Sequence, residues 1–158
     1  MKLATFAAGC FWGVEEAFLS SGRVLSTKVG YCGGHTSSPT YQQVCTGTTG
    51  HAESLQVAYD PAKTTYGELL HLFWRTHDPT TKDRQGPDVG SQYRSVIFYH
   101  DAEQRTEAEE SLSERQKELG SKIVTQIVAA STFYPAEEYH QQYIRKRGGG
   151  HGSCGWAS

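Results

Sequence analysis

The 158-residue sequence has no long apolar run, few prolines and no excess of charge of one sign. A helix that crosses a bilayer needs roughly 20 apolar residues in succession, so we expect a protein that does not span a membrane. Lys and Arg number 15 against 17 Asp and Glu, and they are dispersed except in the run 145–147. A net charge of −2 leaves no basic surface for a phosphate backbone, and nucleic acid is not an expected partner.

Cysteine is also scarce, with 4 in the chain, and neither a CxxC nor an HExxH spacing accompanies the 7 histidines. This pattern predicts no metal site and no bound cofactor. Small residues lead from Lys2 into Cys10 as they do in a bacterial lipoprotein signal. A signal peptide takes about 15 to 30 residues, however, and this stretch is too short. We therefore expect a cytoplasmic protein, in which reduced thiols serve catalysis more often than structural disulfides.

The apolar periodicity predicts one domain of alternating strands and helices. The expected strands are 2–8, 24–29, 54–59, 93–99 and 123–130, and the expected helices are 13–21, 66–74, 101–119 and a segment that begins at Pro135. Long loops are expected at 30–50 and 78–90. This order predicts an α/β (α+β) fold, a two-layer sandwich of helices on a mixed β-sheet with a ferredoxin-like core. Residues 1–147 form the expected domain, followed by a flexible glycine-rich tail at 148–158.

Cys10 lies at the expected joint between the first strand and the first helix. The positive end of a helix dipole stabilises a thiolate, which would make this cysteine a nucleophile. Burial as a small apolar side chain is the other interpretation, and the spacing alone leaves both open. Phe11 and Trp12 follow directly, where their rings could line a pocket for a small uncharged group or could serve only packing.

Several segments together resemble peptide methionine sulfoxide reductase A, and they cover nearly the whole chain. The first is the compact aromatic motif Gly9-Cys10-Phe11-Trp12-Gly13. The others, in the order of the family, are Gly30-Tyr31-Cys32-Gly33-Gly34, Pro39-Thr40-Tyr41, Gly50-His51-Ala52-Glu53, Tyr59-Asp60-Pro61, the segment 88–95 and the segment 134–143. The resemblance implies reduction of the S epimer of methionine sulfoxide, free or in proteins, with transfer of the oxygen to Cys10 in the domain 1–147.

The resemblance also implies a set of residues around the sulfoxide oxygen. Glu53 matches the acid, which must be buried if its pKa is to be high enough to donate a proton near neutral pH. Tyr41 and Tyr93 match hydroxyl donors to the oxygen, and Asp88 matches an aspartate that orients water or a hydroxyl. Without the resemblance we would expect a solvated loop carboxylate at Glu53, packing roles for the tyrosines and a plain turn residue at Asp88.

A second thiol must convert the resulting sulfenic acid to a disulfide. The expected resolving residue is Cys154 in the glycine-rich tail, with thioredoxin, or dithiothreitol in vitro, as the reductant. Only Cys154 lies beyond Cys45, whereas some relatives carry two cysteines in the tail, so a relay within the tail is excluded. Cys32 is the rival resolving residue because its glycine-rich surroundings could flex, and Cys45 is expected to be buried packing.

Two other classes of function remain open on the residues alone. A cysteine hydrolase or acyl transferase would use Cys10 as the nucleophile and His51 or His140 as the base. A binding module would use Phe11 and Trp12 as an aromatic cage without any chemistry. No large apolar patch can be inferred from the sequence, so a monomer is expected.

Overall fold

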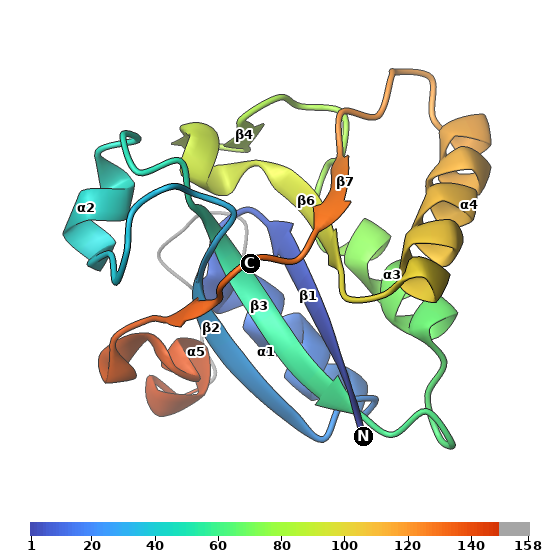
Figure 1. The fold of residues 1–158 in the computed structure, drawn as a ribbon, viewed down its shortest axis with the longest axis horizontal. Coiled ribbons are helices and arrows are strands. Elements are labelled where there is room, and N and C mark those ends of the chain that lie inside the picture. The colour runs from blue at the N-terminus through green and yellow to red at the C-terminus, as the bar shows by residue number, and fades with distance from the viewer. Residues whose placement is uncertain (149–158) are drawn as a thin grey trace.

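A six-stranded mixed sheet forms the centre of the protein (Figure 1). The computed structural model describes residues 1–148. The strands of this sheet are β1 (Lys2–Ala8), β2 (Ser26–Cys32), β3 (Ala52–Tyr59), β6 (Ser95–Tyr99), β7 (Gln126–Ala129) and β8 (Tyr134–Pro135), in the order β7-β6-β1-β3-β2-β8. Neighbouring strands are antiparallel except for the parallel pair β6 and β7. The predicted mixed sheet is therefore confirmed.

The remaining elements surround this sheet (Figure 1). The helices are α1 (Phe11–Ser21), α2 (Tyr41–Cys45), α3 (Tyr66–Arg75), α4 (Ala102–Glu118) and α5 (Tyr143–Lys146). A small hairpin is formed by β4 (Arg84–Gln85) and β5 (Asp88–Val89), and single 3-10 turns lie at Ser91–Tyr93 and Glu138–His140.

The main core lies between one face of the sheet and the helices α1 and α3. Ala4, Phe6 and Ala8 point to this face because side chains along a strand alternate. The ring of Phe6 stacks on Phe18 of α1 at 5.6 Å and on Phe73 of α3 at 5.2 Å between centroids. The predicted two-layer arrangement of helices on a sheet is confirmed.

The opposite face of the sheet is crossed by the segment that joins β7 to β8 (Figure 1). Since β7 and β8 lie at opposite edges, the chain must pass over the strands between them. Phe133 in this crossing packs on the cluster of Ala7, Ala52 and Val96. At Gly30 in β2 a Cβ would lie 2.4 Å from the Tyr134 carbonyl oxygen and 2.6 Å from the Phe133 ring, so only glycine permits this approach.

The predicted helix from Pro135 is wrong. Pro135 pairs with Gly30 in β2, a 3-10 turn follows, and only Tyr143–Lys146 is α-helical. The Gln141 side chain in this segment bonds to the backbone of β2. The Gln141 amide accepts from the Val29 N–H at 3.0 Å and donates to the Val29 carbonyl at 2.9 Å. Gln142 has φ +51°, which ends the turn and separates it from α5.

Both predicted loops contain regular structure. The segment 30–50 begins with the end of β2 and contains α2, whose Thr40 and Gln43 form a capping box. The segment 78–90 contains the β4 and β5 hairpin. These elements are two to five residues long, too short for an apolar period to appear in the sequence.

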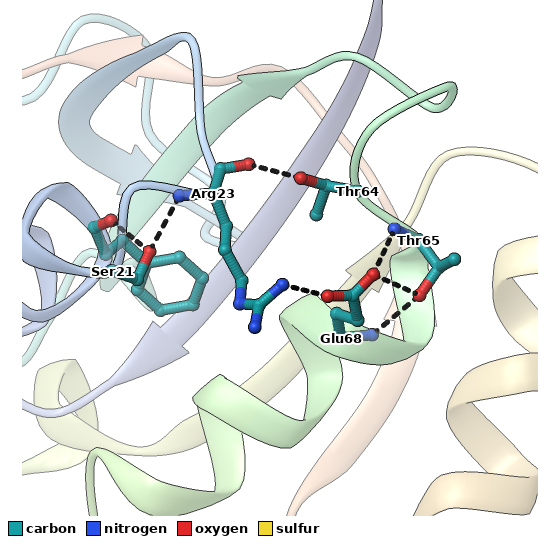
Figure 2. A network of polar contacts seen from close by, with 6 residues as sticks. Ser21, Arg23, Thr64, Thr65 and Glu68 are labelled. Atoms are coloured by element: carbon teal, nitrogen blue, oxygen red, sulfur yellow. Dashed lines mark hydrogen bonds and ion pairs between the residues drawn. The ribbon is translucent and has the colours of Figure 1, made fainter.

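A polar network joins the C-terminal end of α1 to the start of α3 (Figure 2). Arg23 forms an ion pair with Glu68, and Glu68 completes a capping box with Thr65. The Thr64 hydroxyl donates to the Arg23 carbonyl at 3.0 Å. Because Arg23 and Glu68 are both partly exposed, their pairing contributes little to stability. The network lies at the end of α1 opposite Cys10.

Candidate active site

Cys10 is the N-cap residue of α1, directly after β1 and one glycine. Gly9 has φ +94°, and a Cβ there would lie 2.9 Å from Cγ of Gln85 in β4. A side chain at this position would therefore strain the backbone and displace the hairpin. The predicted strand-to-helix joint is confirmed, and the Cys10 residue, 7% exposed, lies at the positive end of the α1 dipole.

Glu53, the second residue of β3, reaches the same helix start. Its Oε1 accepts a hydrogen bond from the Phe11 N–H at 3.2 Å, so the carboxyl group lies beside the first turn of α1. The residue is 1% exposed. The burial that its predicted role requires is therefore present, and the alternative of a solvated loop carboxylate is wrong.

Two tyrosine hydroxyls share this environment with Glu53. Burial, and then the charge of Glu53, raise the pKa of Tyr41, the first residue of α2, above its ordinary value. The same two causes raise the pKa of Tyr93, to which Asp88 and Cys10 also contribute. Both hydroxyls therefore keep their protons at neutral pH and can act as hydrogen-bond donors.

Asp88 lies in β5, close enough to Tyr93 for its charge to act there. Burial raises the pKa of Asp88. Within residues 1–148 its Oδ2 is buried without a hydrogen-bond partner. The structure thus places Cys10, Glu53 and Asp88, from three separate parts of the chain, close enough to Tyr93 for their charges to act on its hydroxyl.

The two aromatic residues after Cys10 have different surroundings. Phe11 is buried, and its ring centroid lies 5.8 Å from that of Tyr31 and 6.5 Å from that of Tyr41. Trp12 is partly exposed and stacks on Tyr143 with 3.8 Å between the centroids. An apolar wall therefore continues from Cys10 to α5.

His140 completes this wall, although no local pattern in the sequence indicates its position. It is fully buried, and its ring centroid lies 5.2 Å from Phe11 and 4.4 Å from Tyr41. Its Nδ1 accepts a hydrogen bond from the Trp12 indole at 2.9 Å. Burial lowers the pKa of His140, which keeps the ring neutral. The resembling segment 134–143 contains this residue, and these contacts give it a structural role rather than that of a free base.

The other candidate base has both ring nitrogens engaged by backbone groups. Nδ1 of His51 accepts from the Gly34 N–H at 3.0 Å, and Nε2 lies 2.8 Å from the Thr36 carbonyl oxygen, to which it donates. Nδ1 of His140 is occupied by Trp12. These contacts give no support to a hydrolase in which His51 takes the thiol proton.

The remaining cysteines differ from their predicted surroundings. Cys32 ends strand β2 and is 1% exposed, so it lies in the sheet and not in the flexible loop that its predicted role requires. Cys45, expected to be buried packing, is exposed at the end of α2 because Val44 takes the buried position instead. Its thiol shares a hydrogen bond with the Tyr41 side chain. Cys154 lies outside the described residues.

Two classes of site are not found in the described part of the chain. Within residues 1–148 no group of three or more His, Cys, Asp or Glu side chains could hold a metal ion. None of the helices described there has the length and apolar character to cross a bilayer.

Comparisons with known proteins agree with the resemblance. The family model for peptide methionine sulfoxide reductase matches residues 2–156. The peptide methionine sulfoxide reductase MsrA of Methanosarcina mazei is 59% identical over 150 residues, which cover 94% of this chain and 71% of that protein.

Two structures of Mxr1 from Saccharomyces cerevisiae are also similar. The reduced form has a TM-score of 0.92 at 43% identity, covering 98% of this chain and 90% of Mxr1. The form in complex with Trx2 has a TM-score of 0.65 at 33% identity, covering 90% of this chain and 84% of that one.

Proposed function

Because this chain belongs to the peptide methionine sulfoxide reductase family and is thus an oxidoreductase, we propose that it reduces methionine-S-sulfoxide, free and in proteins, through Cys10. The observation that carries the proposal is the hydrogen bond from the Phe11 N–H to Glu53. It supports a mechanism in which a buried carboxyl group and the Cys10 thiol act on the same sulfoxide.

In the first step the Cys10 thiolate attacks the sulfoxide, and the oxygen passes to the Cys10 sulfur. The sulfoxide gains two electrons and leaves as the thioether of methionine, while the thiol loses two electrons and becomes a sulfenic acid. The N-terminal position of Cys10 on an eleven-residue helix favours the thiolate.

Glu53 supplies the proton that the sulfoxide oxygen needs before its bond to sulfur can break. A carboxyl group donates a proton near neutral pH only when its neutral form is favoured, and removal from water favours that form. The burial of Glu53 supports this role. Its hydrogen bond with the Phe11 N–H holds the group beside the reacting sulfur.

The hydroxyls of Tyr41 and Tyr93 donate hydrogen bonds to the sulfoxide oxygen as its negative charge grows. Donors fixed in a dry site are worth more than donors in water because they need no reorganisation. Asp88, near Tyr93, orients that hydroxyl or a water molecule. Phe11 and Trp12 bind the apolar methyl end of the substrate, and the stacking of Trp12 on Tyr143 fixes that wall.

The enzyme is reset by a second thiol and an external dithiol. Cys154 attacks the sulfenic acid, which releases water and forms a Cys10–Cys154 disulfide. Thioredoxin then reduces this disulfide by exchange and becomes oxidised in turn. The complex of Mxr1 with Trx2 supports a thioredoxin as the partner.

The test is to incubate the protein with each epimer of methionine sulfoxide separately and with dithiothreitol, and to map the disulfide by mass spectrometry. We expect turnover of the S epimer and a Cys10–Cys154 disulfide when the reductant is withheld. Turnover of the R epimer alone, or full activity of Cys10→Ser, would overturn the proposal.

A further inference from the structure

Glu137 joins two tyrosines of the site through its two carboxylate oxygens. Oε2 accepts a hydrogen bond from the backbone N–H of Tyr41 at 2.9 Å. Oε1 accepts a hydrogen bond from the hydroxyl of Tyr31 at 2.8 Å. Glu137 lies between β8 and the last 3-10 turn, far from both tyrosines along the chain.

The two tyrosines belong to different elements, and both of their rings lie near the ring of Phe11. Tyr31 is fully buried in β2, is the cross-strand neighbour of Glu53, and packs its ring on Phe11. Tyr41 begins α2, and its side chain carries one of the hydroxyls assigned to the sulfoxide oxygen. Glu137 therefore ties the helix of Tyr41 to the strand beside the proposed acid.

Helix α2 needs such a tie. It has five residues, and isolated helices this short do not persist in water because nucleation costs more than one turn of hydrogen bonds returns. Its first backbone N–H has no partner within the helix. An ionised carboxylate satisfies that donor with a stronger bond than a neutral acceptor.

The charge state of Glu137 agrees with this role. Burial opposes ionisation, but the hydrogen bonds from the Tyr41 N–H and the Tyr31 hydroxyl outweigh it and lower the pKa of Glu137. The carboxylate is thus ionised at neutral pH, and both oxygens are available as acceptors.

We propose that Glu137 is a positioning residue for oxygen transfer, which holds the Tyr41 hydroxyl at the sulfoxide oxygen by anchoring the start of α2 to Tyr31. This inference rests on the proposed function of Tyr41. Glu137 itself does not touch the substrate and exchanges no proton with it.

A double-mutant cycle with Tyr41 separates positioning from a general loss of structure. In single turnovers with methionine-S-sulfoxide, we expect Glu137→Ala to slow oxygen transfer roughly 10- to 100-fold, because small displacements of a reacting group cost that much. In a Tyr41→Phe background, where the hydroxyl is absent, the same change should cost less than about threefold, since coupled residues do not add.

Glu137→Gln tests whether the two hydrogen bonds, to Tyr41 and Tyr31, are enough to position the Tyr41 hydroxyl without a negative charge. Glu137→Gln keeps an oxygen acceptor for the Tyr41 N–H and offers its amide N–H to the Tyr31 oxygen, so its rate should stay within about threefold of wild type. Glu138→Ala is the matched control, since that side chain is 91% exposed and pairs with Lys146 at 3.8 Å. It should leave the rate unchanged.

The proposal is overturned if Glu137→Ala reacts as fast as Glu138→Ala, or if its full loss recurs in the Tyr41→Phe background. Should Glu137→Ala not fold, Glu137→Asp replaces it in the cycle, because the shorter side chain cannot reach both donors and the same non-additivity is expected. A wild-type protein inactive towards methionine sulfoxide would instead refute the proposed function. An additive cycle in an active enzyme would refute the role of Glu137 alone.

Discussion

The indole N–H of Trp12 donates a hydrogen bond to Nδ1 of His140 at 2.9 Å, across 128 residues of sequence. An indole nitrogen can only donate, so Nδ1 must accept and the proton of the neutral ring lies on Nε2. The bond therefore exists only while His140 is neutral. Because burial lowers the pKa of His140 below its ordinary 6.5, the contact persists at neutral pH.

The ionisation of His140 can be followed directly. We expect its ring to titrate below pH 6.5 in long-range proton–nitrogen NMR spectra, with Nδ1 as the unprotonated nitrogen at neutral pH. In Trp12→Phe the bond to the neutral form is lost, and the pKa should rise towards its ordinary value. A ring that carries its proton on Nδ1 at pH 7 would contradict the assignment.

Glu53→Gln tests the proposed acid without removing its structural contact. The amide oxygen of Gln can still accept from the Phe11 N–H, so the thermal midpoint should change little. Loss of the proton donor should slow oxygen transfer by about 10²- to 10⁴-fold. The pH–rate profile of single turnovers should also lose the limb that reports the Glu53 proton. A variant with an unaltered profile would remove Glu53 from the acid role.

Cysteine variants separate oxygen transfer from recycling. Cys10→Ser should abolish reduction, whereas Cys154→Ser should complete one turnover and then stall with thioredoxin as the reductant, because no resolving thiol remains. Cys32→Ala is the matched control, since Cys32 is buried at the end of β2. Quantifying methionine per enzyme in a rapid-quench experiment decides between these outcomes, and multiple turnovers by Cys154→Ser with thioredoxin would require another resolving residue.

The sequence predicts the position of Cys10 well because its determinants are local. A short apolar strand, Gly9 and an amphipathic helix follow one another, and the structure has β1 and α1 at these places. The fold class follows from the same alternation of elements.

Other features depend on contacts between distant segments. Glu53 reaches the start of α1 because β3 pairs with β1, Leu55 opposite Phe6, and nothing near Glu53 in the sequence indicates its burial. The contact of Glu137 with Tyr41 spans 96 residues. The apolar periodicity after Pro135 predicts a helix that the structure does not contain. A contact between distant segments decides there too, since Gln141 bonds to the β2 backbone.

His77 predicts how the stability of the fold depends on pH. It is buried at the end of α3, its Nδ1 donates to the Phe73 carbonyl at 3.0 Å, and its Nε2 accepts from the Ser95 hydroxyl at 2.7 Å. The Ser95 oxygen in turn lies 2.8 Å from the Thr125 hydroxyl. Burial favours the neutral ring and lowers the pKa of His77 from 6.5 to about 4.

The pH dependence of the free energy of unfolding follows from the protonation of His77 in the folded and unfolded states. Between these values the unfolded chain binds a proton at His77 and the folded protein does not, so the free energy of unfolding falls as the pH falls. The free energy of unfolding is unaffected by His77 protonation above pH 6.5. Between pH 6.5 and pH 4 it falls, by about 3 kcal/mol in total at about 1.4 kcal/mol per pH unit. Urea unfolding at pH 7, 6 and 5 measures this slope, and His77→Gln, which cannot titrate, should lower it by about one proton. An equal slope in both proteins would contradict this prediction, because His77 would then be protonated to the same extent in the folded and unfolded states.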